Sequence, residues 1–290
     1  MIYFTGNAFD WAGLLLCASA GFVLCRQAGL FNIGIEGQIY AGGFCASAVM
    51  LALYNHVPAP LAFFCGVIVA AACGALLAAL CGLFKKFTGA NELITTFLLS
   101  ASVIPLFDYL IGGPLRGTDG SLLAMQKLPP ELVYMSILPP SNLNASFLAP
   151  PTITYFVHFF LYRTAAGYRL RLAGSAPAFA RYGGIDPERF WVGSLAVSGA
   201  CAGLAGFLMV AGTDGIAHQG FPAGLGWAAV AAGLIARNKP ALLFPAAIFY
   251  AALKFTTGAL LPGTGLSSSV FTLITGTALL LSTFNSWERR

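Results

Sequence analysis

The chain has 290 residues, of which 58% are hydrophobic and only 9% are charged, and its mean hydropathy is +0.80. This composition excludes an ordinary soluble globular protein and predicts a polytopic helical membrane protein. The net charge of +5 is explained by where the basic residues fall along the chain, so no nucleic-acid partner is expected.

Nine apolar segments alternate with turn signals and charged residues. We place them at 9–25, 35–54, 58–84, 93–111, 147–162, 190–211, 226–236, 240–254 and 267–284. A bilayer core about 30 Å thick needs about 20 helical residues, and several of these segments are shorter. The sequence therefore predicts an all-α membrane bundle, one domain over residues 1–290, with about 8–10 transmembrane segments that include broken or partial helices.

Basic residues are distributed unevenly between the two sides that alternating spans would define. Twelve fall on one side: Arg26, Lys85, Lys86, Arg163, Arg169, Arg171, Arg181, Arg189, Arg237, Lys239, Arg289 and Arg290. Only Arg116, Lys127 and Lys254 fall on the other. By the positive-inside rule the first side is cytoplasmic, which places the N-terminus outside and the C-terminus in the cytoplasm.

The first two apolar segments are joined by the glycine-rich stretch GLFNIGIEGQ at residues 29–38. It holds Asn32, Glu36 and Gln38 at or near the membrane, where irregular polar backbone survives only if it is buried in protein or lines a wet cavity. We therefore predict that these three residues belong to a translocation path. We also expect Glu36 to lie partly buried at a helix N-terminus, beside Asn32 or Gln38. The alternative is a surface connection in which a helix N-terminus merely favours Glu36.

Small residues recur every four positions in two segments and predict close helix packing rather than ligand sites. They are Gly66, Ala70, Gly74, Ala78 and Gly82 in the first segment, and Ser198, Ala202 and Gly206 in the second.

The segment 93–111 is preceded by Asn91 and Glu92 on the cytoplasmic side. A helix N-cap followed by a first-turn acid accounts for these two residues. The alternative places them in the translocation path together with Thr95, which lies one turn after Asn91.

The two long connections differ in character. Residues 112–146 contain five prolines and few charges, and we expect a partly ordered extracytoplasmic loop. Residues 163–189 are basic and carry helix signals: Ser175 is expected to cap a short helix that has Pro177 in its first turn and ends at Gly183-Gly184. The Asp186-Pro187-Glu188 run then predicts the start of the next membrane helix.

A second glycine-rich break, GFPAGLGW, spans residues 220–227 and in this topology faces outside, whereas the first break faces inside. Opposed breaks in two halves are what an inverted repeat would give, although the similarity between the halves does not establish one. We expect 31–38 and 220–227 to approach each other near the translocation path, which would include Phe221 and Trp227.

Sites for catalysis or a cofactor are not indicated. The sequence lacks a G-x-x-x-x-G-K-[ST] phosphate loop and the common hydrolase and metalloprotease motifs, so ATP hydrolysis cannot be assigned to this chain. Its seven cysteines all fall in apolar segments without a Cys-x-x-Cys pair. They are expected to behave as small hydrophobic residues, and no metal site or disulfide framework is predicted.

Taken in order, several motifs closely resemble those of permease subunits of ABC importers for simple sugars, nucleosides and riboflavin. They are GLFNIGIEGQ (29–38), NELITT (91–96), GYRLRLAG (167–174), YGGI (182–185), SGACAGLAG (198–206), GLGWAAVAAGL (224–234) and Pro240. The resemblance covers nearly the whole chain from about residue 13.

This resemblance implies a non-enzymatic subunit in a bacterial cytoplasmic (inner) membrane. Its partners would be a second permease, usually a different chain, a cytoplasmic ATPase that binds ATP and Mg, and an extracytoplasmic substrate-binding protein, often a lipoprotein. The region around 175–184 would correspond to the coupling helix that docks on the ATPase. The residues assigned to coupling are Ser175, Pro177, Phe179, Arg181, Tyr182, Gly183 and Gly184.

The substrate and the driving force stay open at this stage. A ribose-bearing or flavin-like solute would suit stacking by aromatic residues such as Phe31, Tyr40, Phe44, Phe221 and Trp227. An ion- or proton-driven secondary transporter is one alternative, and a purely structural membrane subunit is another. For 163–189 the alternative to ATPase docking is a solvated basic loop near anionic lipid heads.

Overall fold

The computed structural model describes residues 2–118, 122–260, 273, 276 and 277. The elements are α1 (Ile2–Gln27), α2 (Ile35–Leu53), α3 (Ala59–Thr88), α4 (Glu92–Gly112), η1 (Pro130–Leu132), η2 (Ala145–Leu148), α5 (Ala149–Arg163), α6 (Ala165–Ser175), α7 (Pro177–Tyr182), α8 (Glu188–Leu208), η3 (Met209–Asp214), α9 (Leu225–Ile235), η4 (Pro240–Leu242) and α10 (Leu243–Leu260). The predicted all-α bundle is confirmed, and each of the first eight apolar segments contains a helix. The ninth, 267–284, lies almost wholly outside the described residues.

The helices differ in length as a bundle with partial spans requires. Four described stretches are long and apolar enough to cross a membrane: Tyr3–Gln27, Ala59–Thr88, Glu92–Gly112 and Glu188–Asp214. By contrast, α9 has 11 residues, about half of the roughly 20 that a bilayer core needs. It starts at Leu225, within the second glycine-rich break.

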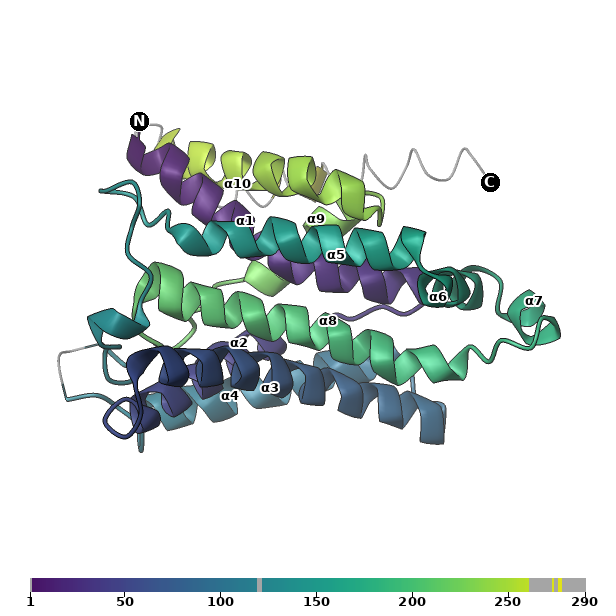
Figure 1. Ribbon diagram of the computed structural model, residues 1–290, viewed down its shortest axis with the longest axis horizontal. Helices are drawn as coiled ribbons and strands as arrows, with labels where there is room; N and C mark the ends of the chain where they lie inside the picture. The colour runs from purple at the N-terminus through teal and green to yellow at the C-terminus, as the bar shows by residue number, and fades with distance from the viewer. Residues whose placement is uncertain (1, 119–121, 261–272, 274–275, 278–290) are drawn as a thin grey trace.

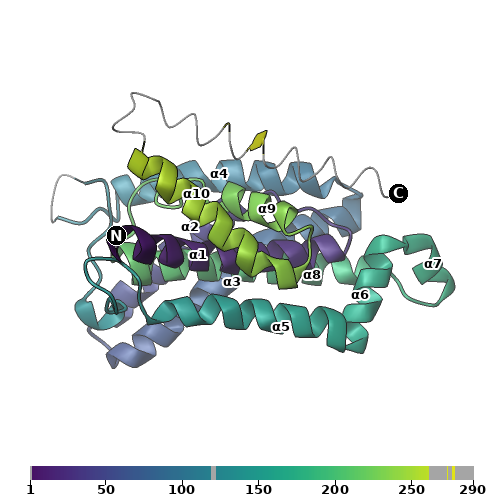
Figure 2. The same ribbon diagram turned by 90° about the horizontal axis from the view of Figure 1, so that it is seen from above.

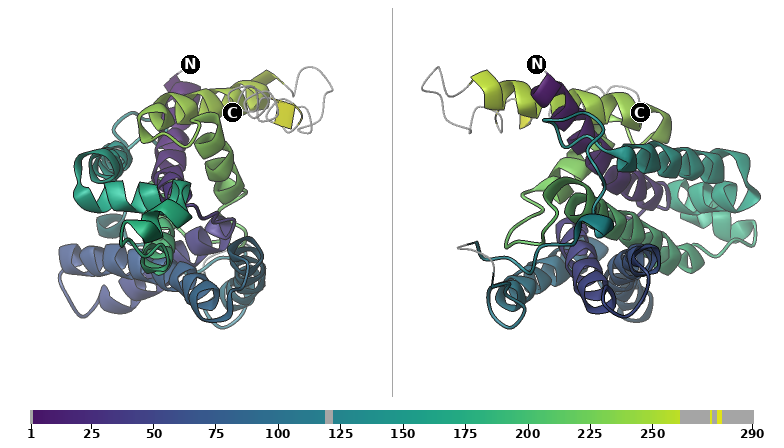
Figure 3. Two further views of the ribbon diagram at one scale, coloured as in Figure 1. Left: turned by 90° about the vertical axis from the view of Figure 1, so that its right-hand side faces the viewer. Right: turned by 60° about the vertical axis from the view of Figure 1, so that its left-hand side comes forward.

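The centre of the bundle is formed by α1 and α8 (Figures 1 and 3). The apolar windows of these two stretches are 89% and 72% buried, whereas those of α3 and α4 are only 28% and 17% buried. The outer faces of α3 and α4 are therefore left for lipid or for another subunit, because a monomer in water would not expose so much apolar surface.

Close packing of α8 depends on the small residues that the sequence singled out. All five members of the α3 stripe are buried. A Cβ atom added at Gly199 of α8 would lie 2.7 Å from the backbone carbon of Gly74, and one added at Gly42 of α2 would lie 2.7 Å from that of Gly203. The backbones touch, so the predicted packing role is confirmed.

The two ends of the bundle carry different structures. The N-terminus and the 113–144 connection lie at one end, and α6 and α7 project at the other (Figures 1 and 2). The connection is ordered by backbone hydrogen bonds to the segment that follows α8, including Tyr134 N to Ala211 O at 2.9 Å. The loop is thus partly ordered, as predicted.

One of the three basic residues counted on the less basic side lies within a helix. Lys254 belongs to α10, and its Nζ lies 3.7 Å from the centroid of the Trp11 ring of α1. The apolar segment does not end at this lysine, because α10 continues past it and the indole face accepts the cation.

Candidate functional site

Asn32 is the centre of the break between α1 and α2. It is completely buried, and its Nδ2 donates to Gln38 Oε1 at 2.8 Å and to Ser198 Oγ of α8 at 3.0 Å. Its Oδ1 accepts from Gln38 Nε2 at 3.1 Å and from the Gly34 amide at 3.0 Å. The amide of Asn32 is therefore fully paired, which allows the chain to leave helical geometry inside the bundle at little cost.

Two hydroxyl groups of α4 complete this arrangement. Thr96 Oγ1 accepts from the Ile33 amide at 3.2 Å, and Ser100 Oγ accepts from the Gly37 amide at 2.8 Å. The amides at a helix N-terminus have no intrahelical acceptor, so hydroxyls one turn apart on a neighbouring helix satisfy them. Thr95, the threonine that the sequence predicts for the path, donates its hydroxyl to the Asn91 carbonyl at 3.2 Å within its own helical turn.

Glu36 is half-buried and lies at a helix N-terminus, but the helix it caps is α9. Its Oε1 accepts from the Gly224 amide at 2.7 Å and its Oε2 from the Gly226 amide at 2.6 Å. A carboxylate at this position is favoured by the free amides and by the helix dipole. The predicted N-terminal placement is thus correct, whereas no hydrogen bond links Glu36 to Asn32 or Gln38 among the described contacts. Lys254 also interacts electrostatically with Glu36.

The second break packs directly on the first, as predicted. The Gly220 amide donates to Tyr40 Oη at 3.0 Å and to Asp108 Oδ1 at 3.3 Å, and the Tyr40 hydroxyl donates to the same Asp108 oxygen. Gln219 Nε2 donates to the Asp108 carbonyl at 2.6 Å. The Phe221 ring stacks on Tyr40 with centroids 4.8 Å apart. Sequence reasoning missed Asp108 and Gln219 as members of this junction.

The aromatic residues near the junction divide into buried and exposed ones. Tyr40, Phe44 and Phe221 are buried and pack on one another or on Phe107. Trp227 is 51% exposed, and its ring meets that of Phe97 edge to face with centroids 6.4 Å apart. Of the aromatic residues proposed for stacking, Trp227 is therefore the most accessible. Phe97, which is also exposed, offers a second ring beside it.

Asn91 and Glu92 behave as the capping interpretation predicts. Asn91 Oδ1 accepts from the Leu93 amide at 2.9 Å, and Glu92 forms an ion pair with Lys85 Nζ at 2.6 Å. Lys85 in turn lies 4.8 Å from the ring centroid of Trp191 at the start of α8. The structure does not bring Asn91 and Glu92 into the region where the 29–38 break meets the 220–227 break.

The segment assigned to coupling forms α7 at the projecting end of the bundle. Seen from that end, α6 and α7 lie in front of the other helices (Figure 3, left). Phe179 and Tyr182 are 65% and 93% exposed, and Arg181 lies 3.3 Å from Glu188. Pro177 begins the helix, and Gly184, with φ +73°, allows the sharp exit after Gly183.

The predicted cap of this helix is wrong. Ser175 is the last residue of α6, and the residue preceding α7 is Ala176, which offers no side-chain acceptor. The fixed φ of Pro177 and its missing N–H make a capping side chain less necessary here. The expected start of α8 is correct, because Asp186 Oδ1 accepts from the Glu188 amide at 3.0 Å.

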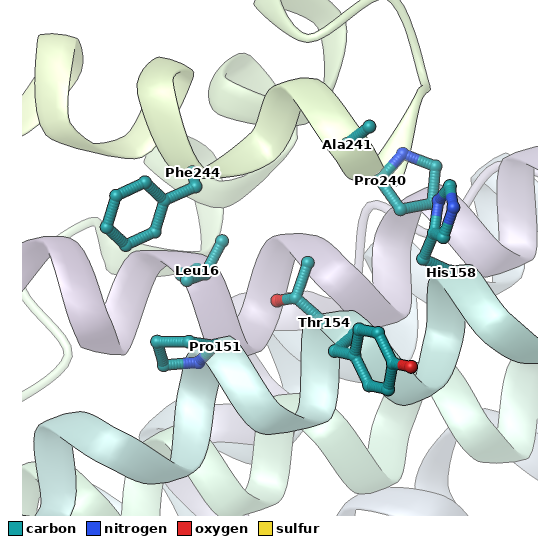
Figure 4. Close-up of a pocket in the computed structure, with 8 residues that line it drawn as sticks. Leu16, Pro151, Thr154, His158, Pro240, Ala241 and Phe244 are labelled. Atoms are coloured by element: carbon teal, nitrogen blue, oxygen red, sulfur yellow. The ribbon is translucent and has the colours of Figure 1, made fainter.

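One small cavity lies beside the first break. A cavity of about 10 Å³ lies between the start of α2 and the Thr96–Ser100 face of α4, which is about the room one water needs. An open groove of about 300 Å³ lies elsewhere, between α1, α5 and α10 (Figure 4). Its lining residues include Leu16, His158 and Phe244 but none of the predicted site residues.

Comparisons with known proteins match most of the chain. The family model described as the permease component of the branched-chain amino acid transport system matches residues 5–282. The probable riboflavin import permease protein RfuC of Treponema pallidum is 32% identical over 94% of this chain and 72% of its own length. The nucleoside ABC transporter permease protein NupB of Lactococcus lactis is 25% identical over 88% of this chain and 71% of its own.

A third curated relative and a solved structure complete the comparison. The glucose ABC transporter permease protein TsgB13 of Haloferax volcanii is 27% identical over 82% of this chain and 65% of its own length. The structure of PsaBC from Streptococcus pneumoniae in complex with Fab aligns with a TM-score of 0.52 over 96% of this chain and 90% of that one, at 15% identity, which shows a shared fold. An ion-driven secondary transporter is not favoured by these relatives. The chain belongs to the family of branched-chain amino acid transport system permease components, and it is a multi-pass permease subunit of an ABC importer.

Proposed function

We propose that this chain forms one half of the path by which an ABC importer carries riboflavin, or a nucleoside of similar ring-and-polyol chemistry, across a bacterial inner membrane. The observation that carries the proposal is the junction in which the Asn32–Gln38 break meets the break at 220–227. Polar side chains inside a membrane bundle are costly and are characteristic of transport paths.

Riboflavin is placed first because of similarity and side-chain chemistry together. The riboflavin permease is 32% identical to this chain, against 25% and 27% for the nucleoside and glucose permeases. Phe97 and Trp227 expose aromatic rings beside the Glu36 junction, and such rings stack on planar heterocycles. A simple sugar has no planar ring and would gain less from this pair.

The partners follow from the same proposal. The weakly buried faces of α3 and α4 would face lipid and a second permease, and an extracytoplasmic binding protein would deliver the solute. The α7 end would be cytoplasmic and the N-terminus outside, since most of the basic residues gather at the α7 end. Phe179 and Tyr182 of α7 would enter a groove of the ATPase, which binds ATP and Mg and performs the hydrolysis.

The test is uptake by the assembled complex in proteoliposomes, with radiolabelled riboflavin, guanosine and glucose supplied separately. We expect ATP-dependent uptake of riboflavin that excess unlabelled glucose does not inhibit. Trp227→Ala should reduce this uptake, whereas Phe156→Ala, which removes a 63% exposed ring from α5, should not. Uptake by this chain alone along an ion gradient would overturn the importer mechanism, and uptake of guanosine or glucose alone would correct the substrate.

A further inference from the structure

The turn that leads into α9 is hydrogen-bonded near both of its ends to a single face of α2. We call residues 219–226 the α9 turn. Glu36 and Tyr40 are four residues apart on α2, so their side chains lie on one face, one turn from each other. Glu36 accepts from the amides at the end of the α9 turn, Gly224 and Gly226. Tyr40 accepts from Gly220, near its beginning.

A second helix, α4, also forms hydrogen bonds with the beginning of the turn. Asp108 of α4 accepts from the Tyr40 hydroxyl and from the Gly220 amide through one carboxylate oxygen, and its backbone carbonyl accepts from Gln219. Because Tyr40 and Asp108 meet at the same amide, removing either group should disturb the same contact. Hydrogen bonds to a charged acceptor are also stronger than those between neutral groups.

The backbone of the α9 turn needs such support. Gly220, Ala223 and Gly224 have φ values of +69°, +46° and +82°, and a left-handed conformation is unfavourable for an alanine. The turn also packs closely on α2, because a Cβ added at Gly226 would lie 2.6 Å from Glu36 Cα. A turn of this kind keeps its shape only while its surroundings hold it.

The rest of α9 is attached to a different helix. A Cβ added at Gly233 would lie 2.8 Å from Phe22 Cε1 of α1, and Gln27 Nε2 of α1 donates to the Asn238 carbonyl at 2.7 Å. Apolar packing, together with one hydrogen bond just past its end, thus fastens α9 to α1, while directional hydrogen bonds fasten its beginning to α2 and α4. The second kind of attachment can break completely over a small displacement, because hydrogen bonds weaken steeply with geometry.

We propose that Tyr40 and Asp108 are positioning residues for transport, which together with Glu36 form a two-point clamp that holds the α9 turn closed against α2 and α4. Both points release when α9 moves with α1 in the transport cycle. The proposal rests on the proposed function, because it assumes that the path runs through this junction. It adds residues that act on the turn and not on the solute.

The test compares Tyr40→Phe, Asp108→Ala and the double variant with the wild-type complex in proteoliposomes. Tyr40→Phe removes the hydroxyl and keeps the ring that stacks on Phe221. Tyr54→Phe is the matched control, because the Tyr54 hydroxyl also donates to a carboxylate, that of Glu131 at 3.0 Å, at the exposed end of α2. The readouts are ATPase activity without solute and the number of solute molecules imported per ATP hydrolysed.

We expect each single variant to raise solute-independent ATPase activity and to lower solute import per ATP by about three- to tenfold, the size expected for one net hydrogen bond. The double variant should lose no more than the worse single variant, since both remove one contact, and Tyr54→Phe should match wild type. Additive losses overturn the clamp. The clamp is also overturned if the variants assemble less well or melt at a lower temperature while the number of solute molecules imported per ATP stays the same. A wild-type complex without ATP-dependent uptake would instead overturn the proposed function itself.

Discussion

The α2–α9 junction and the α6–α7 projection place their polar and aromatic groups in opposite ways. At the junction, Asn32, Gln38 and Phe221 are buried and paired within the chain. On α7, Phe179 and Tyr182 extend into the surroundings. Under the proposed function the junction rearranges internally and is built from contacts that hold one conformation, whereas the exposed rings of α7 meet another subunit. The two regions should therefore respond differently to mutation.

The sharpest test of the buried region is Asn32→Ala. It leaves the Gln38 amide and the Ser198 hydroxyl without their partner, and orphaned buried groups cost about 1–3 kcal/mol each, so we expect a total of about 2–6 kcal/mol. Thermal unfolding in detergent measures the loss. Asn91→Ala removes an exposed N-cap and should cost about 1 kcal/mol. Equal melting temperatures for the two variants would contradict the assignment of Asn32 as the centre of the break.

Glu36→Gln comes next. The new NH₂ group would face one of the two amides that now donate to the carboxylate, and the favourable charge at the α9 N-terminus would be lost. We expect destabilisation by about 1.5–3 kcal/mol, measured by chemical or thermal unfolding, together with reduced uptake. Glu131→Gln, on an exposed acid of the 113–144 connection, should stay within about 0.5 kcal/mol of wild type. If both variants unfold alike, the carboxylate of Glu36 is not needed to cap α9.

A smaller effect is expected from Ser100→Ala. This change leaves the Gly37 amide without its acceptor, and hydrogen bonds between membrane helices contribute about 0.6–1 kcal/mol. Ser102→Ala is the matched control, because the exposed Ser102 hydroxyl donates only to the Leu98 carbonyl of its own helix. Unfolding curves of the two variants should separate. Superimposed curves would show that the α4 hydroxyl is dispensable for the break.

The smallest effect on stability belongs to the projection. The double variant Phe179→Ala/Tyr182→Ala removes exposed rings and should change the free energy of unfolding by no more than about 0.5 kcal/mol. We nevertheless expect loss of solute-stimulated ATPase activity in the assembled complex. Phe87→Ala, which removes a 76% exposed ring near the end of α3, should keep that activity, as should Ser175→Ala. Wild-type stimulation in the double variant would exclude docking through these rings and favour a solvated basic segment.

The sequence was sufficient to predict the features that depend on one stretch of chain. Asn32 and Glu36 stand between apolar runs, and a polar group in that setting has few acceptable places. The stripe from Gly66 to Gly82 has a strict four-residue period, which indicates a packing face in a helix. The start of α7 at Pro177 and its end at Gly183-Gly184 are local backbone signals.

Pairings across the chain were not predictable in the same way. Tyr40 and Asp108 are 68 residues apart and Asp108 and Gln219 are 111 apart, and a single sequence contains no term that links them. Thr95 and Thr96 illustrate a second limit, because Thr96 is the threonine whose hydroxyl accepts from the Ile33 amide, a contact that the sequence did not indicate. One residue turns a helix by about 100°, and the segment around these threonines is apolar on all sides, so no amphipathic period identifies the inner face.

The glycine contacts of α8 have a mechanical consequence. Its backbone touches α2 and α3 through the glycine contacts described above, and a Cβ added at Gly21 of α1 would lie 2.8 Å from the Ser198 carbonyl. Contacts made by main chain have no rotamers with which to absorb a displacement, so α8 behaves as a stiff shaft between three neighbours. It begins six residues after α7 ends. Ten residues farther along α8, about 15 Å, the Ser198 hydroxyl accepts from the Asn32 side chain. A displacement of α8 by a force on α7 would therefore reach the polar break through the main chain. The first contact to change there would be the hydrogen bond between Asn32 and Ser198.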